Sequence, residues 1–112
     1  DMEARSIRTL RISAALIDDG AGRLLLVRKA GTHWFMQAGG KIEESETPLG
    51  ALRRELGEEI GLFLDDDDAH YLGRFSAKAA NESDTVVEAE VFHVRGQHIP
   101  QIQSEIEEAV WV

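Results

Sequence analysis

The sequence predicts a single α/β (α+β) domain built from strands around one amphipathic helix. Several short runs are rich in β-branched and apolar residues and are separated by turns that contain Gly and Asp, which is typical of strands. Residues 48–60 instead repeat their apolar residues at the spacing of a helix. Strands on both sides of one helix favour a mixed sheet with the helix packed on it. With 112 residues, the chain is expected to form one domain over residues 1–112.

The composition narrows the choice of partner. A net charge of −9 argues against nucleic acid or an anionic membrane as the partner, because both would repel this surface. There is no cysteine, which excludes disulfides, a thiolate metal site and a cysteine nucleophile. No apolar run has the length of a membrane span, and no signal peptide is visible. These features are compatible with a cytoplasmic protein that binds a small molecule.

The first half of the chain contains three candidate strands. Residues 7–17 have a β-type composition and end at a turn in residues 18–20. Residues 23–28 form a continuous apolar run, as expected of a strand buried on both faces, and we expect them to pair with residues 7–17 as a hairpin. A short strand or strand edge is expected at the aromatic residues 34–36.

The predicted helix has recognisable ends. Thr47 precedes it as an N-cap, Pro48 occupies the first helical position, where proline is favoured, and Gly61 follows as a stop. The apolar residues between these ends share one side of the helix, and they are Leu49, Leu52, Leu56 and Ile60. We therefore expect this side of the helix to pack against the sheet.

Three carboxylates lie beside this apolar stripe. At about 100° per residue, Glu55, Glu58 and Glu59 share one helix face. Like charges this close destabilise a helix unless something offsets their repulsion. A divalent cation such as Mg²⁺ or Mn²⁺ is a natural partner, because these ions prefer oxygen ligands. The alternative is an ordinary solvated acidic face, as is usual for runs of charge.

The second half of the chain reads as strands joined by polar loops. The four aspartates at residues 65–68 are expected to form a solvated loop, since they lack the spacing and the glycine of an EF-hand loop. The other expected elements are strands at residues 70–78 and 86–95 joined by a polar turn at 79–85, a loop at 96–103, a short turn or helix at 104–109 and a last strand at 110–112.

The carboxylates of the helix belong to a longer pattern in residues 40–62. This stretch resembles the Nudix box, written G-x5-E-x7-R-E-U-x-E-E-x-G-U, in which U is an aliphatic residue. A chance match is on the order of 10⁻⁹ per starting position at average residue usage. All nine specified positions match, and they are Gly40, Glu46, Arg54, Glu55, Leu56, Glu58, Glu59, Gly61 and Leu62.

The resemblance implies a Nudix-type α/β/α sandwich around a mixed sheet. Members usually carry another helix after the last strand, whereas this sequence stops at Val112, so we expect that helix to be absent. One face of the sheet would then be uncovered, and a large exposed apolar face is a liability. We therefore expect either a homodimer that covers this face or a longer native chain whose tail does so.

The same resemblance implies a metal-dependent site. It implies that Glu55, Glu58 and Glu59 bind Mg²⁺ or Mn²⁺, with the backbone carbonyl of Gly40 as a further ligand. Arg54 would hold one of these carboxylates in place. The implied reaction is attack of water on a phosphorus of a diphosphate, with Glu58 or Glu59 taking the proton.

Three further residues are assigned to the reaction. In several family members a glutamate in a loop before the last strand contributes, and Glu105 is the candidate here, although it could equally be a solvated residue of an acidic turn. The resemblance assigns Arg28 and Lys41 to the substrate phosphates. In relatives a basic residue at the place of Arg28 contacts phosphate, which Arg suits well, and the alternative for Arg28 is a plain surface charge. Five aromatic residues could hold a base or belong to the core, and they are Trp34, Phe35, Tyr71, Phe75 and Phe92.

The resemblance therefore implies hydrolysis of a nucleoside diphosphate linked to another moiety, NDP–X giving NMP and P–X. The Gly-Gly-Lys-Ile-Glu opening of the box is most similar to MutT-type nucleoside triphosphate pyrophosphatases. Ala38 stands where the family commonly has proline, which relaxes the loop but removes no ligand. The alternative is a non-catalytic module that senses a nucleotide, but such domains usually show damage in the box core, which is whole here. The absence of cysteine argues against isoprenoid diphosphate isomerisation.

Overall fold

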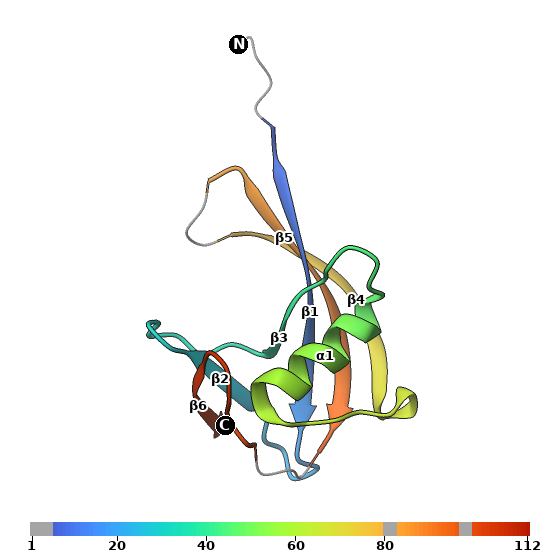
Figure 1. The fold of residues 1–112 in the computed structure, drawn as a ribbon, viewed down its shortest axis with the longest axis vertical. Helices are drawn as coiled ribbons and strands as arrows, with labels where there is room; N and C mark the ends of the chain where they lie inside the picture. Colours follow the sequence, from blue (N-terminus) through green and yellow to red (C-terminus); the bar gives the residue numbers. More distant parts are fainter. Residues whose placement is uncertain (1–5, 80–82, 97–99) are drawn as a thin grey trace.

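The computed structural model describes residues 6–79, 83–96 and 100–112 (Figure 1). Its elements, in chain order, are β1 (Arg8–Asp18), β2 (Leu25–Lys29), β3 (Ala38–Lys41), α1 (Pro48–Ile60), the 3₁₀ turn η1 (Asp66–Asp68), β4 (Ala69–Lys78), β5 (Thr85–Arg95) and β6 (Ile106–Trp111). The expected α+β class is confirmed. The turn expected at residues 79–85 and the loop expected at 96–103 lie partly outside the described residues. No helix in the described part of the chain has the length and apolarity that a membrane span requires.

The larger sheet has four strands in the order β3-β1-β5-β4. Strand β1 pairs antiparallel with β3 and parallel with β5, and β5 pairs antiparallel with β4. The sheet is therefore mixed, as the sequence predicted. Ala15 lies opposite Phe92 and Ile17 opposite Val94 in the parallel pair. All four of these side chains belong to the core.

The hairpin predicted for residues 7–17 and 23–28 is wrong. Both edges of β1 are occupied, by β3 and β5, so the next strand has to pair elsewhere. Strand β2 instead forms a separate two-stranded antiparallel sheet with β6. Just before β2, Leu24 forms an isolated antiparallel bridge with Asp18 at the end of β1. Leu25 and Val27 in β2 are buried.

The elements predicted around this small sheet also need correction. The turn or helix expected at residues 104–109 is wrong, because a strand begins at Ile106 and continues to Trp111. Of the strand expected at residues 34–36, Met36 forms an isolated bridge with Val27, while Trp34 and Phe35 are exposed. Met36 packs against the core, which explains why this residue of the three is the one that pairs.

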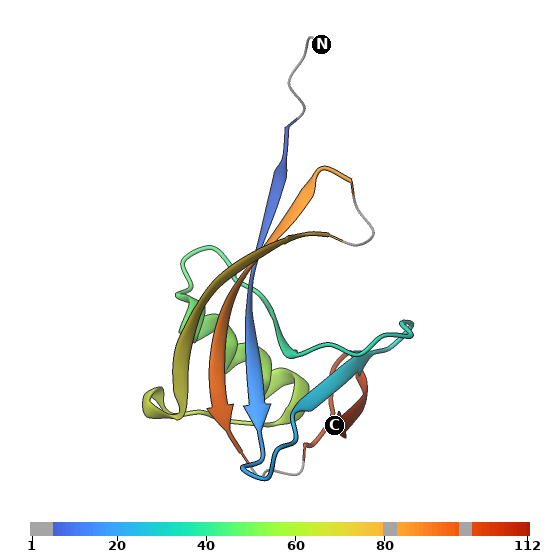
Figure 2. The same ribbon diagram turned by 180° about the vertical axis from the view of Figure 1, so that it is seen from behind.

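Helix α1 lies across one face of the four-stranded sheet (Figure 1). The predicted ends are confirmed: the Thr47 hydroxyl accepts the Gly50 N–H at 3.0 Å, and Gly61 ends the helix with a φ of 67°. The Ser13 hydroxyl on β1 donates to the Pro48 carbonyl at 2.7 Å, which ties the helix start to the sheet. The predicted apolar side packs inward, with Leu52, Leu56 and Ile60 fully buried and Leu49 packed against the core. Figure 2 shows the opposite face of the sheet, over which no helix lies in the described part of the chain.

Candidate active site

Two adjacent glycines in β3 bring the sheet backbone against the carboxylates of α1. A Cβ on Gly39 would lie 2.1 Å from the Ser13 carbonyl oxygen, and its φ of +145° also disfavours any side chain. A Cβ on Gly40 would lie 2.5 Å from the carboxyl carbon of Glu55. The Gly39–Gly40 backbone can therefore approach both β1 and the acidic helix face, which no larger residue permits.

Glu59 is the buried carboxylate of the site, with 6% of its surface exposed. Its Oε1 accepts the N–H of Gly39 at 3.2 Å. Burial raises the pKa of Glu59 to about 7, and the hydrogen bond from Gly39 partly opposes this rise. The charges of Glu55 and Glu105 also raise this pKa, whereas Lys29 lowers it. The pKa of this one carboxylate on α1 therefore depends on residues from β2, from β3, from α1 itself and from the segment just before β6.

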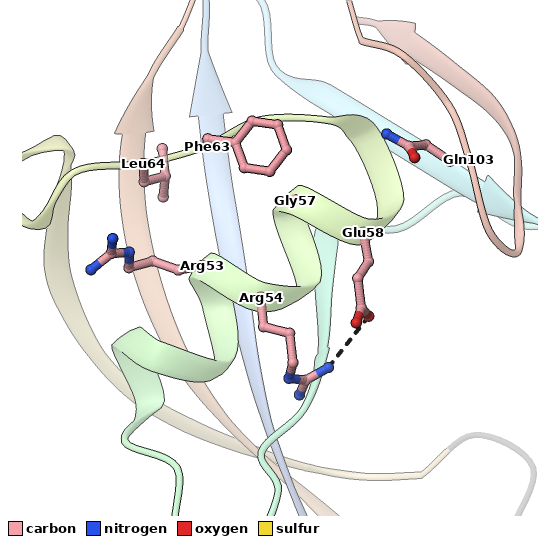
Figure 3. Close-up of a pocket in the computed structure, with 7 residues that line it drawn as sticks. All are labelled: Arg53, Arg54, Gly57, Glu58, Phe63, Leu64 and Gln103. Carbon is pink, nitrogen blue, oxygen red and sulfur yellow. Dashed lines mark hydrogen bonds and ion pairs between the residues drawn. The ribbon is translucent and has the colours of Figure 1, made fainter.

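Arg54 connects the other acidic residues of the helix and the preceding loop. Its guanidinium donates two hydrogen bonds to Glu46, at 2.7 and 2.9 Å, and this contact lowers the pKa of Glu46 to about 2. It also contacts Glu55 at 2.9 Å and donates to the Lys41 carbonyl at 3.0 Å. Figure 3 shows its contact with Glu58, at 3.5 Å. Arg54 thereby neutralises part of the acidic face and fixes the loop before the helix.

The donor set of this face suits a hard divalent cation. The described residues contain no cluster of three or more His, Asp or Glu side chains that is close enough to hold a metal as they lie. Glu55 and Glu58 are directed to Arg54, and Glu59 to Gly39. Carboxylate oxygens within about one helical turn, two of them (Glu55 and Glu59) against the Gly39–Gly40 backbone, are nevertheless the ligand type that Mg²⁺ and Mn²⁺ prefer. The residues present fit such an ion.

The remaining charged residues assigned from the sequence lie around this face in different settings. Glu105 is exposed just before β6, and its charge acts on Glu59, as noted above. The side chain of Lys41 is exposed at the end of β3. Arg28 forms ion pairs with Glu107 at 2.9 Å and Glu108 at 3.0 Å, so acidic residues of β6 occupy its guanidinium.

Sequence reasoning missed Lys29, which follows Arg28 at the end of β2 and acts electrostatically on Glu59. The signal was a second basic residue in the pair Arg28-Lys29 at a strand end. The pairing of β2 with β6 is irregular between Arg28 and Lys29, so regular strand alternation alone would not have separated their roles.

The five aromatic residues do not gather around the acidic face. Phe92 is buried in the core and meets Tyr71 edge to face, with ring centroids 5.3 Å apart. Tyr71 and Phe75 are exposed on the edge strand β4, and Trp34 and Phe35 are exposed in the loop after β2. Phe92 is therefore a core residue, and the other four occupy two separate regions of the fold.

A family model described as the NUDIX domain matches residues 8–112. The chain belongs to the NUDIX family. This confirms the resemblance that residues 40–62 carry. It also places strands β1 to β6, beyond the box itself, within the family's domain.

Two relatives match this NUDIX domain over limited lengths. An RNA pyrophosphohydrolase of Halorhodospira halophila is 45% identical over 47 residues, which cover 42% of this chain and 26% of that protein. An 8-oxo-dGTP diphosphatase of Haemophilus influenzae is 36% identical over 59 residues, which cover 49% of this chain and 43% of that protein. The match thus spans less than half the length of either relative.

Solved structures support the fold over nearly the whole chain. A MutT protein from Methanosarcina mazei superposes with a TM-score of 0.81 at 22% identity, covering 97% of this chain and 80% of that one. A MutT NUDIX hydrolase from Burkholderia pseudomallei gives a TM-score of 0.78 at 23% identity, covering 93% and 82%. At these identities the likeness establishes the shared fold.

Proposed function

We propose that this NUDIX domain is a metal-dependent diphosphohydrolase that converts NDP–X to NMP and P–X. The observation that carries the proposal is the meeting of the box carboxylates with the Gly39–Gly40 backbone. There Glu59 is buried, and Arg54 holds Glu55 and Glu58. A nucleoside triphosphate pyrophosphatase of the MutT type is the specific form that we favour.

In this proposal Glu55, Glu58 and Glu59, with the Gly40 carbonyl, hold Mg²⁺ or Mn²⁺. When bound, such an ion polarises phosphoryl oxygens and lowers the pKa of a bound water. Arg54 positions Glu55 by direct contact and leaves Glu58 with a longer contact, so Glu58 is the carboxylate that can move most easily.

The proton of the attacking water has two candidate acceptors in this chain. Glu58 is exposed, whereas Glu59 is buried, and burial raises the pKa of Glu59 to about 7 when no metal is bound. We assign Glu58 or Glu59 as the general base, with Glu105 assisting from the β6 side. Lys41 and Arg28 contact the substrate phosphates, and Arg28 would first have to release Glu107 and Glu108.

The substrate class that we propose is a free nucleotide, and the net charge supports it. The names of the two relatives describe one protein that acts on RNA and one that acts on 8-oxo-dGTP. We favour a free nucleotide here, because a net charge of −9 opposes a long polyanion more strongly than a single triphosphate. A cytoplasmic location stays a prediction, as does the alternative of a homodimer or a longer native chain.

The test is a screen of nucleoside triphosphates, nucleoside diphosphate sugars and an RNA with a 5′-triphosphate, each with Mg²⁺ and with Mn²⁺. We expect a nucleoside monophosphate as product for a free nucleotide, and loss of turnover in EDTA. Glu58→Gln should lose most of kcat and keep its melting temperature, with Glu44→Gln in the exposed loop as the matched control. Nucleotide binding without turnover, in every metal, would instead favour the sensing module. Activity that survives EDTA would contradict the metal assignment.

A further inference from the structure

An open groove of about 560 Å³ runs along the outer side of α1, next to the candidate active site. One end of the groove is lined by Arg54 and Glu58, which belong to the acidic face. The other end is lined by Phe63 and Gln103, which belong to the segments after α1 and before β6 (Figure 3). We call it the Phe63 groove. The groove is continuous with the acidic face, because Glu58 belongs to both and Arg54, which also lines the groove, contacts Glu55 at 2.9 Å.

Phe63 is an exposed aromatic side chain in a defined position. It is 81% exposed, more than any other exposed large hydrophobic side chain in the described residues. Its ring nevertheless rests on the helix, because a Cβ on Gly57 would lie 3.0 Å from the ring edge. Gly57 therefore makes room for the ring beside α1. Burial cannot explain this position, since most of the ring stays in water.

The polar groups of the groove suit a nucleotide. Arg53 lines it and forms a solvent-exposed ion pair with Asp66 at 2.6 Å. Gln103 is anchored by its backbone N–H, which donates to the Glu59 carbonyl at 3.0 Å. The carboxamide of Gln103 carries both donors and an acceptor, as recognition of a base edge requires. An aromatic face, a cation and a carboxamide thus border one groove.

We propose that the Phe63 groove is a nucleobase subsite, in which a base stacks on Phe63 while its phosphates reach the acidic face at Glu58. This inference rests on the proposed function, because it needs a nucleotide at that face. Stacking of a base on an aromatic ring explains an exposed phenylalanine next to a phosphate-processing site, since every base offers a flat face. Gln103 then contributes to the choice between bases.

The kinetic test compares substrates with and without a base. Phe63→Ala should raise KM for a nucleoside triphosphate by about 5- to 150-fold, with kcat little changed, because one stacking contact is lost. KM for inorganic triphosphate, which has no base, should stay within about twofold. Phe63→Trp, which keeps an aromatic ring, should have a KM for the nucleoside triphosphate close to that of the parent. The matched control is Phe75→Ala, which removes an exposed ring from β4, away from the groove.

A binding test separates this inference from the proposed function. In the Phe63→Trp variant, a nucleoside monophosphate should quench the new indole fluorescence without metal, relative to the same titration of the parent. Absence of this extra quenching overturns the subsite, whether or not the enzyme is active. Equal KM changes for the nucleotide and for inorganic triphosphate also overturn it, as does a change of oligomeric state in Phe63→Ala with KM unaltered. Failure of all turnover with quenching intact would overturn the hydrolase proposal alone.

Discussion

The buried carboxylate of Glu59 gives the sharpest test of the site. Burial raises its pKa from the usual 4.5 to about 7. The folded state therefore keeps a proton that the unfolded chain releases between about pH 4.5 and pH 7. Because the folded pKa is the higher one, the stability that this group contributes is complete at low pH and is lost as the pH rises through this window. At pH 8 without metal, the unfolding free energy is therefore lower by about 3 kcal/mol than it would be at low pH, as far as Glu59 alone is concerned.

Glu59→Gln isolates this contribution. Glutamine keeps the shape and can still accept the Gly39 N–H, but it cannot ionise. We expect the variant to be more stable than the parent by up to about 3 kcal/mol at pH 8 and to lose this advantage toward pH 4.5. Urea unfolding in EDTA, repeated across this range, measures the difference. Other carboxylates affect both proteins equally, so the difference reports Glu59.

Two outcomes would refute the reasoning about Glu59. Parallel stability curves for parent and variant across pH 4.5 to 8 would show that burial does not perturb this carboxylate. A variant that is less stable than the parent at pH 8 would show that the charge is already compensated. Glu44→Gln, in the exposed loop, is the control and should follow the parent. Adding Mg²⁺ at pH 8 should stabilise the parent more than Glu59→Gln, because a ligand that binds the folded state raises its stability.

The other predictions concern packing and the arrangement of the acidic face. Leu56→Ala should lower the unfolding free energy by about 2–5 kcal/mol in urea melts, because the side chain is fully buried in α1, and a loss below about 1 kcal/mol would contradict this core. Gly39→Ala should melt far below the parent, since its Cβ would lie 2.1 Å from a backbone oxygen of β1. Gly22→Ala also places a side chain at a positive φ, of 92°, but meets no neighbouring atom within 4 Å, so it should cost less. If both alanine variants melt alike, steric crowding at β3 is not the cause. Arg54→Lys should reduce kcat with the fold intact, because an ammonium cannot reproduce the paired contact with Glu46. Unchanged kcat in this variant would count against a positioning role.

The helix could be predicted from the sequence almost to the residue, because its signals are local. The N-cap Thr47, the proline after it and the stop at Gly61 lie within a few residues of the bonds that they form. The apolar stripe needs nothing but helical periodicity to be found. The pattern of residues 40–62 adds the family.

Strand pairing could not be predicted in the same way, because it depends on residues far apart in the chain. Residues 7–17 and 23–28 are neighbours in sequence, and a turn between them favoured a hairpin. Strand β1 pairs with β3 on one edge and with β5 on the other, and nothing in the sequence of β1 itself predicts these partners. The segment after Ser104 is rich in glutamate, which concealed a strand whose Ile106 is buried opposite β2.

The same limit applies to the candidate site. Periodicity placed Glu55, Glu58 and Glu59 on one helix face, but it could not distinguish the buried Glu59 from the exposed Glu58. That distinction arises from β3, whose glycines bring backbone against one side of the face. The influence of Lys29 on Glu59 likewise depends on where β2 ends in space.

The order of the strands has a consequence for how the chain folds. Helix α1 and the β4–β5 hairpin use contacts between close neighbours in sequence and can form early. The β1–β5 and β2–β6 pairs instead join the first part of the chain to the last, so their loop closure must precede any gain from pairing. Such non-local topologies fold on the order of milliseconds to seconds. Stopped-flow refolding of a Trp34→Phe variant, in which Trp111 of β6 is the remaining tryptophan, would measure the late step. During synthesis, the edge of β1 that pairs with β5 therefore stays unpaired until β5 has left the ribosome. An unpaired strand edge can associate with other chains, so this interval favours misassociation of the nascent chain.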